Sequence, residues 1–116
     1  MAAIASTPVR AFSISVVPYR NVVAAVPAGE LDLATVDELA ATIGELRAVG
    51  FTDIVLDLRK VDFIDSTGLQ LLLRLHADAA RDGHRIGLVS PEPMVGRIFD
   101  ITGTRDLFSW QDRFPA

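Results

Sequence analysis

Cysteine is absent from the 116 residues, which excludes disulfide bonds, thiolate metal ligands and cysteine nucleophiles. Histidine is scarce too: His76 and His84 stand without a cluster of other metal ligands, so we expect no metal site. No run approaches the roughly 18 to 20 apolar residues that cross a bilayer, and the N-terminal segment lacks the basic start and apolar core of a secretory signal. These absences predict a cytoplasmic protein without a membrane span.

Basic residues are also few. The 11 lysines and arginines stand against 15 acidic residues, giving a formal net charge of −4 at pH 7, and Lys60 is the only lysine. A nucleic-acid-binding surface normally needs a basic patch to meet the phosphates, so this composition argues against a nucleic-acid partner. Half of the residues are hydrophobic, enough for the core of one domain. We expect that domain at residues 10–113, with a flexible N-terminal arm at 1–9.

Short apolar runs alternate along the chain with longer segments of helical periodicity. Phe12, Ile14 and Val16 alternate with serines, as in a half-buried strand, and Pro27 should end the following strand or place it at a sheet edge. Strands are expected at 12–16, 22–26, 54–58, 85–89 and 107–110, and helices at 34–49, 66–81 and 93–101. The order β-β-α-β-α-β-α-β predicts an α/β fold, with a single mixed sheet of four to five strands and helices mainly on one face.

A polar turn, DSTG at residues 65–68, precedes the leucine-rich second helix. Ser66 occupies the expected N-cap position, where its hydroxyl would accept a hydrogen bond from a free amide of the first helical turn. Gly68 would keep that turn open to a partner or a phosphate. Taken alone, the turn is more typical of an ordinary helix cap than of a functional serine. Asp32, in a GELD loop at 29–32, has the same local interpretation as the cap of the first helix.

No catalytic machinery accompanies Ser66. The serine is not part of a G-x-S-x-G elbow, and neither histidine stands in a relation to it that would predict a general base. The segment that begins at Gly68, GLQLLLR, contains no Walker phosphate loop. A hydrolase that uses Ser66 is therefore a minor alternative, and we expect no enzymatic activity, no cofactor and no small-molecule substrate.

Residues 63–69 read FIDSTGL, which resembles the F-x-D-S-[ST]-G-L turn of STAS-domain anti-sigma factor antagonists, also called anti-anti-sigma factors. Two further segments resemble this family in the same order. GELD at 29–32 resembles the loop before its first helix, and GRIFDITG at 96–103, with the LF pair after it, resembles its third helix and last strand. The resemblance covers roughly residues 10 to 110. The family commonly carries a fourth helix after the last strand, and this chain stops before such a helix would form.

The resemblance implies a bacterial, stress-response regulator of transcription that works by partner switching. It implies that the unphosphorylated chain binds an anti-sigma factor serine kinase and frees a sigma factor, that the kinase then phosphorylates Ser66, and that a phosphatase resets the cycle. Thr67 offers a second hydroxyl, and only the order of residues in the family motif singles out Ser66. The partner-binding residues that the resemblance implies are Asp32, Asp65, Ser66, Thr67, Gly68 and Leu69.

Two alternatives stay open at this point. The chain is either the phosphorylated switch just described or an unphosphorylated STAS scaffold, a regulatory subunit of a transport or signalling assembly. Along the Ser66 helix, Leu71 and Leu75 form a stripe beside the main apolar face of Leu69, Leu72 and Leu73. Core packing is the favoured interpretation of this stripe, ahead of contact with a partner.

Overall fold

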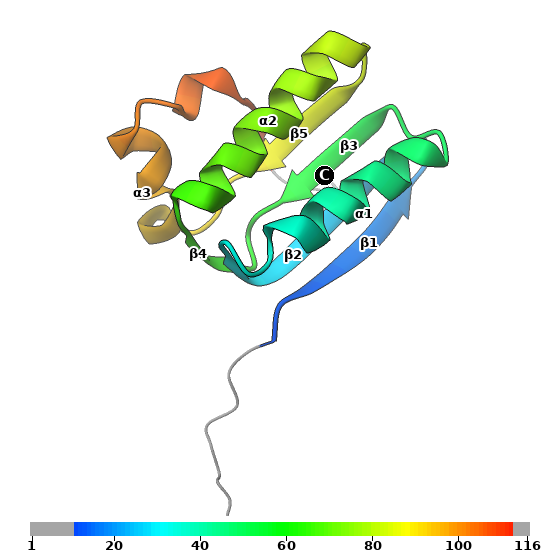
Figure 1. The fold of residues 1–116 in the computed structure, drawn as a ribbon. Helices are drawn as coiled ribbons and strands as arrows, with labels where there is room; N and C mark the ends of the chain where they lie inside the picture. Colours follow the sequence, from blue (N-terminus) through cyan, green and yellow to red (C-terminus); the bar gives the residue numbers. More distant parts are fainter. Residues whose placement is uncertain (1–10, 113–116) are drawn as a thin grey trace, which may run out of the picture.

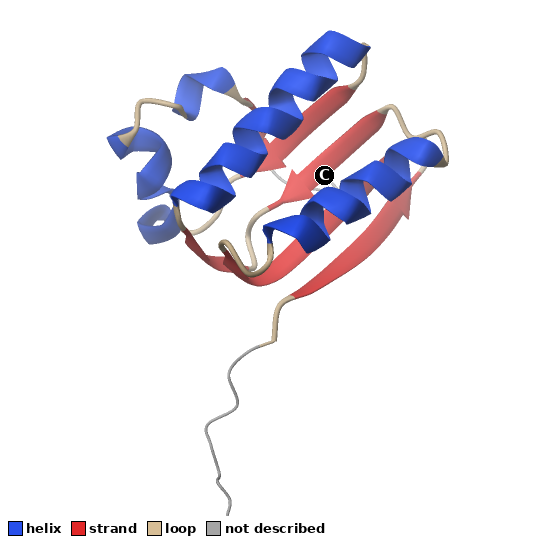
Figure 2. Ribbon diagram, viewed as in Figure 1, coloured by secondary structure: helices blue, strands red, loops and turns tan. Residues whose placement is uncertain are grey.

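The computed structural model describes residues 11–112, which form a six-stranded mixed sheet with three α-helices (Figures 1 and 2). The strands are β1 (Ser13–Tyr19), β2 (Val22–Leu31), β3 (Asp53–Asp57), β4 (Val61–Ile64), β5 (Arg85–Val89) and β6 (Ser109–Gln111). The helices are α1 (Val36–Ala48), α2 (Ser66–Asp82) and α3 (Pro93–Ile101), and a short 3-10 helix spans Arg105–Leu107. The expected arm at residues 1–9 lies outside the described residues.

The strands follow the order β1-β2-β3-β5-β6, and β4 pairs with the far end of β2. β1 and β2 form an antiparallel hairpin whose turn contains Arg20, with φ 60°, and Asn21. The other pairs are parallel, and parallel neighbours need crossover connections. α1 and α2 provide such connections and lie side by side on one face of the sheet (Figure 1). The prediction of a mixed sheet with helices mainly on one face is confirmed.

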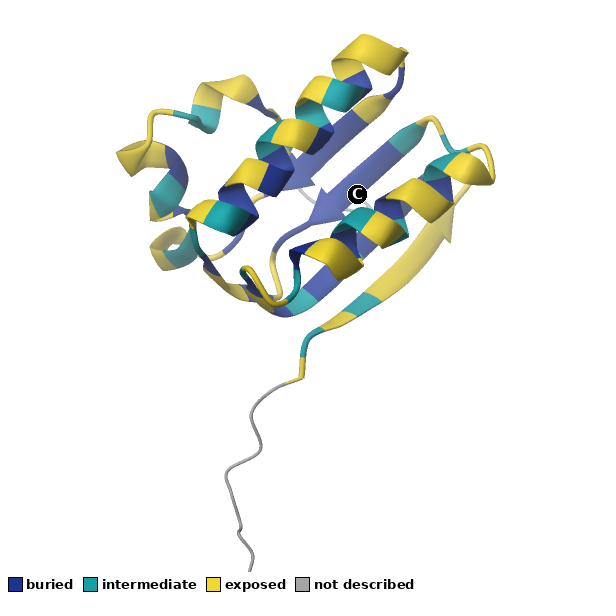
Figure 3. Ribbon diagram, viewed as in Figure 1, coloured by how far each residue is buried: buried dark blue, intermediate teal, exposed yellow. Residues whose placement is uncertain are grey.

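The core lies between this face of the sheet and the two helices, as the burial colours of Figure 3 show. Ile54 and Leu56 of β3 are fully buried and join the same cluster as Leu72 of α2, because alternate residues of a strand point to the same face. The buried residues of α2 are Gly68, Leu69, Leu71, Leu72, Leu75 and Ala79. Leu71 and Leu75 therefore belong to the core, which confirms the favoured interpretation of their stripe.

β2 is longer than the sequence predicts, because it continues through Pro27 instead of ending there. The proline faces Ile14 of β1. On its other side it falls between the segment of β2 that pairs with β3 (Val23–Ala25) and the segment that pairs with β4 (Gly29–Leu31). No partner strand needs the amide that proline lacks, so the strand passes through this position inside the sheet.

β4 is a strand where the sequence predicts only a loop, and it raises the number of strands to six against the four to five expected. It lacks the alternation of a half-buried strand: Val61 and Ile64 are buried, while Asp62 and Phe63 between them are exposed. β4 pairs with the end of β2, in the GELD segment that was also expected to be a loop. Both segments become strands because they meet each other, and neither carries a local strand pattern.

The C-terminal elements follow the prediction closely. β5 and α3 have the expected bounds, and the last strand starts two residues late because the 3-10 helix precedes it. Arg105 connects α3 with β6. Its Nε lies 2.6 Å from Asp100 Oδ1, and its guanidinium packs over the rings of Phe99 and Trp110. Trp110 Nε1 in turn donates a hydrogen bond to Arg105 O at 2.7 Å. Within residues 11–112, no helix has the length and apolar character needed to cross a membrane.

Candidate functional site

The predicted site lies where the end of β2 meets the start of α2. Asp65 donates its backbone N–H to Leu31 O at 3.3 Å, which ties the turn before α2 to the last residue of β2. Gly68 lies against the same carbonyl: a Cβ at this position would overlap Leu31 O and stand 3.1 Å from the Ile64 side chain. The close approach of helix and strand therefore requires glycine here, whereas the sequence suggested that it keeps the turn open. This contact brings the loop after β2 beside the turn before α2.

Asp65, not Ser66, is the N-cap of α2. Its Oδ1 accepts a hydrogen bond from Gly68 N at 2.9 Å, and its carbonyl accepts one from Leu69 N at 2.9 Å. Asp65 has the extended backbone of an N-cap, with φ −98° and ψ −174°. Ser66 is the first helical residue, and it is exposed. The prediction that Ser66 caps the helix is wrong by one position, and the serine hydroxyl is left outside the cap.

Asp32 shapes the loop between β2 and α1 without capping α1. Its Oδ1 accepts a hydrogen bond from Ala34 N at 2.9 Å, while Thr35 occupies the N-cap position of the helix. The Thr35 hydroxyl accepts from Asp32 N at 3.0 Å and donates to Glu30 O at 2.7 Å, which closes a compact turn. The local interpretation of Asp32 as the helix cap is therefore wrong, because its carboxylate caps the turn that leads into the helix. The residue stays partly exposed.

Acidic side chains gather near the turn that precedes α2. Glu30, Asp32 and Asp62 line a shallow cavity of about 200 Å³, and we call these three carboxylates the acidic rim. Among residues 11–112, no group of histidine and acidic side chains is arranged to hold a metal ion. What the rim offers to a partner is negative charge, which favours a basic surface opposite it.

Large apolar side chains, which the sequence does not assign to a partner surface, are exposed on β4 and α3. Phe63 of β4 is 46% exposed, and Met94 and Ile101 of α3 are 79% and 74% exposed. These three residues, the apolar patch, line a groove of about 410 Å³ between β4 and α3. Asp62 lines both this groove and the cavity of the acidic rim, so the two surfaces are continuous. Exposed apolar clusters of this kind mark interaction sites.

The structure places the six predicted partner-binding residues in two groups. Those at the surface are Asp32, Asp65, Ser66 and Thr67. Gly68 and Leu69 lie beneath it; Leu69 is only 5% exposed and belongs to the core. These two residues hold the surface group in place from below. The apolar patch is the part of the surface that the sequence missed, and its only signal was that α3 holds more apolar residues than one buried face needs.

The family model of the STAS domain matches residues 13–115 of the chain. An anti-sigma-B factor antagonist of Staphylococcus aureus (strain NCTC 8325 / PS 47) is 35% identical over 79 residues, which make up 68% of this chain and 73% of the relative. The chain therefore belongs to the STAS domain family, as its motifs indicated.

Solved structures similar to the chain include further antagonists. An anti-sigma factor antagonist from Mycobacterium paratuberculosis is 25% identical and has a TM-score of 0.75, covering 90% of this chain and 88% of its own. The anti-sigma factor antagonist SpoIIAA in its unphosphorylated form is 25% identical with a TM-score of 0.64, covering 89% of each chain. SpoIIAA in its phosphorylated form has the same identity and TM-score, over 89% of this chain and 93% of its own. A relative with this fold is thus known in both phosphorylation states.

Proposed function

We propose that the chain is an anti-sigma factor antagonist that binds an anti-sigma factor serine kinase, frees the sigma factor, and is released when Ser66 is phosphorylated. One observation carries the proposal. Ser66 is exposed at the first position of α2, and only Asp65 separates it from β4, whose Asp62 belongs to the acidic rim and whose Phe63 belongs to the apolar patch. The names of the relatives and the phosphorylated form of SpoIIAA support the same function.

A phosphate on Ser66 would act on the interface and leave the fold intact. It adds about −1.5 to −2 charges and three acceptor oxygens, and a helix N-terminus favours such an anion by about 0.3–1 kcal/mol at exposed sites. The Asp65 carboxylate already accepts the hydrogen bond of the Gly68 amide, so a negatively charged group would lie beside the new phosphate. In a complex, both anions would lose water next to an apolar surface, which is costly without compensating partners. The phosphorylated chain therefore leaves its partner.

The rim and the patch have separate roles in this proposal. The apolar patch supplies binding free energy, at about 25 cal/mol per Å² of apolar area removed from water. The acidic rim selects a basic surface on the kinase and orients the complex. Ser66 lies four residues after Asp62 of the rim and three residues after Phe63 of the patch. A single modification therefore adds charge next to both surfaces. This arrangement needs no catalytic group in the chain itself.

The proposal also assigns a division of labour. The kinase supplies the phosphoryl group, a phosphatase removes it, and the chain acts in the cytoplasm as a binding module made of residues 10–113. Nucleic acid, membrane and small-molecule substrates have no part in the cycle. Saturable binding of ATP by the purified chain at micromolar concentration would contradict this division.

The switch can be tested by titration calorimetry of a cognate anti-sigma factor kinase against four forms of the chain. Unmodified protein and Ser66→Ala should bind tightly. Phosphorylated protein should bind weakly, and Ser66→Asp should lie between, because one planar carboxylate imitates the phosphate only in part. Equal affinity of the phosphorylated and unmodified forms would refute the switch.

The modified residue can be identified by intact mass after incubation with kinase and ATP. The wild type and Ser15→Ala, a control at another exposed serine, should each gain one phosphate, and Ser66→Ala should gain none. A phosphate that maps to Thr67 would contradict the assignment. If the kinase binds the chain without modifying it, or does not bind it, the unphosphorylated scaffold becomes the better explanation.

The role of the apolar patch can be tested in the same titration with a matched pair of variants. Ile101 and Val49 are both 74% exposed, but Val49 follows the C-terminal end of α1 and lies outside the patch. Ile101→Ser should weaken kinase binding about tenfold or more, which corresponds to about 1.4 kcal/mol. Val49→Ser should leave the affinity unchanged, and equal effects of the two substitutions would remove the patch from the interface.

A further inference from the structure

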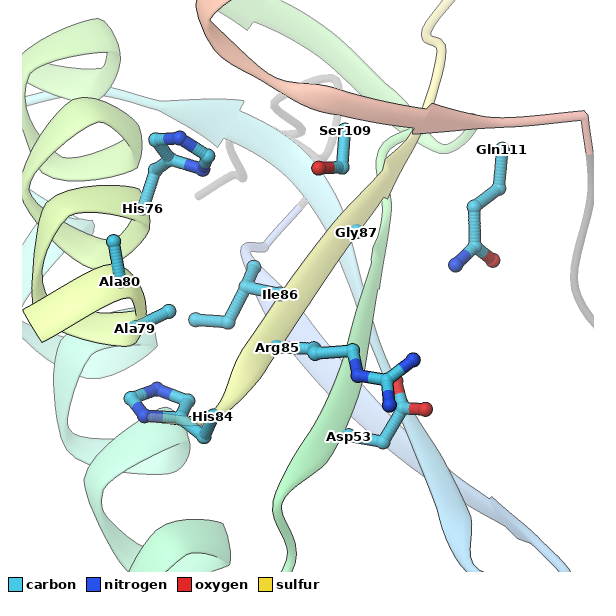
Figure 4. A pocket seen from close by; sticks show the side chains of 10 residues that line it. All are labelled: Asp53, His76, Ala79, Ala80, His84, Arg85, Ile86, Gly87, Ser109 and Gln111. Carbon is cyan, nitrogen blue, oxygen red and sulfur yellow. The ribbon is translucent and has the colours of Figure 1, made fainter. Parts of the chain in front are cut away.

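His84 lies at the opposite end of α2 from Ser66. It follows the helix and precedes β5, and the 17 residues of α2 span about 25 Å. Gly83, with φ 76°, turns the chain after the helix, and His84 N donates a hydrogen bond to Ala79 O at 3.1 Å. The imidazole lines the cavity drawn in Figure 4, and the residue is only 8% exposed.

The imidazole lacks a full set of hydrogen-bond partners. Within residues 11–112, Nδ1 of His84 is buried and has no hydrogen-bond partner. A neutral imidazole can leave one nitrogen as an unused acceptor, because its tautomer places the proton on the other nitrogen. An imidazolium carries N–H donors on both nitrogens, so it would bury an unsatisfied donor together with a charge. The site therefore accommodates the neutral ring and disfavours the protonated one.

The charged groups around His84 do not offset this cost. The titratable groups that line one flanking cavity are Arg47 of α1 with Arg74 and Asp78 of α2. Those that line the other are Asp53 of β3, His76 of α2 and Arg85 of β5 (Figure 4). The carboxylates near the end of α2 already form ion pairs with arginines. Asp78 lies 3.2 Å from Arg81, and Asp82 lies 3.0 Å from Arg81 and 3.6 Å from Arg47. Burial first, and then Arg47, hold the pKa of His84 below its ordinary value, against the opposing effects of Asp82 and Asp78.

We propose that His84 is an acid-sensitive lock on the junction of α1, α2 and β5: protonation of its imidazole opens this junction and destabilises the domain. The direction follows from proton linkage. A histidine whose pKa is lower in the folded chain than in the unfolded chain takes up its proton mainly on unfolding. Its stabilising contribution is complete above about pH 6.5, the usual histidine pKa, and is lost as the pH falls from there toward the folded pKa. The lock is closed at neutral pH and opens in acid.

Urea unfolding of the full chain between about pH 8 and about pH 5 tests the lock. Wild type is compared with His84→Leu, which cannot titrate there. The carboxylates and His76 are present in both proteins, so the difference between wild type and His84→Leu isolates the imidazole of His84. The folding equilibrium constant of the wild type should fall up to about 30-fold further than that of His84→Leu, the limit for an unfolded pKa of about 6.5.

Proton NMR of the wild-type chain gives a second measurement that does not depend on a variant. The chain has two histidines, so two sets of imidazole signals must be followed. His84 should titrate below the ordinary histidine pKa, or only when the chain unfolds. An ordinary or raised pKa, or the same pH dependence of wild type and His84→Leu, would overturn the proposal; if His84→Leu does not fold, the NMR titration decides. No partner is used, so failure here would leave the Ser66 switch untouched.

Discussion

The two ends of α2 differ in whether they can accommodate a charged group. At its start, Ser66 is exposed and follows an ionisable cap, Asp65, whose carboxylate bonds to the first helical turn. At its end, Gly83 turns the chain so that His84 is buried, with one ring nitrogen left without a partner among the described residues. One helix thus joins a surface where a charge can be added and solvated to a junction where a charge cannot be accommodated. A modification switch belongs at the first kind of end, and a structural lock at the second.

The largest effect on stability should come from Gly68→Ala at the start of the helix. A Cβ there overlaps Leu31 O, so either α2 or β2 must shift, at a cost of about 1–3 kcal/mol. Gly44→Ala is the matched control, because that glycine lies within α1 and no atom stands within 4 Å of the position that a Cβ would occupy. This substitution should stabilise the chain by about 0.5–1 kcal/mol. Urea unfolding measures both, and unchanged stability of Gly68→Ala would show that the helix and strand are not in close contact.

Gly83→Ala should have the next largest effect, at the other end. Nothing lies within 4 Å of a Cβ at Gly83, so the cost arises from the backbone alone, whose φ of 76° is unfavourable for alanine by about 1–2 kcal/mol. Gly83→Asn should cost less, because asparagine tolerates the left-handed conformation better. The free energy of unfolding of the three proteins should therefore decrease in the order glycine, asparagine, alanine. A different order would mean that the turn before His84 is not held as described.

The smallest effect concerns the cap. Asp65→Ala should destabilise by about 1 kcal/mol, since it removes the acceptor for the Gly68 amide, while Asp65→Asn should keep most of the stability. Ser66→Ala should change stability by less than about 0.5 kcal/mol, as is usual for an exposed position outside a cap. Thermal or urea unfolding distinguishes the two residues. A larger loss for Ser66→Ala than for Asp65→Ala would restore the serine as the cap.

Local patterns were sufficient for elements with clear boundaries. β5 at Arg85–Val89 and α3 at Pro93–Ile101 have the predicted bounds, and α2 ends one residue beyond its predicted end. Proline at the start of α3 and glycine after α2 are signals that lie inside or next to the element they bound. Segments with a distant partner were missed, and β4 is the clearest case, because its pairing with the end of β2 joins two stretches that each resemble a loop.

The sequence by itself determined the chemistry of the candidate switch: a hydroxyl in an F-x-D-S-[ST]-G-L motif at the start of a leucine-rich helix. Only the tertiary structure decided that Phe63, Met94 and Ile101 are exposed beside it, although they resemble core residues such as Leu72 in the sequence. It also decided that His84, polar and next to a turn, is buried. The physical reason is that a motif and a helix start depend on neighbouring residues, whereas burial depends on which distant segments pack over a side chain.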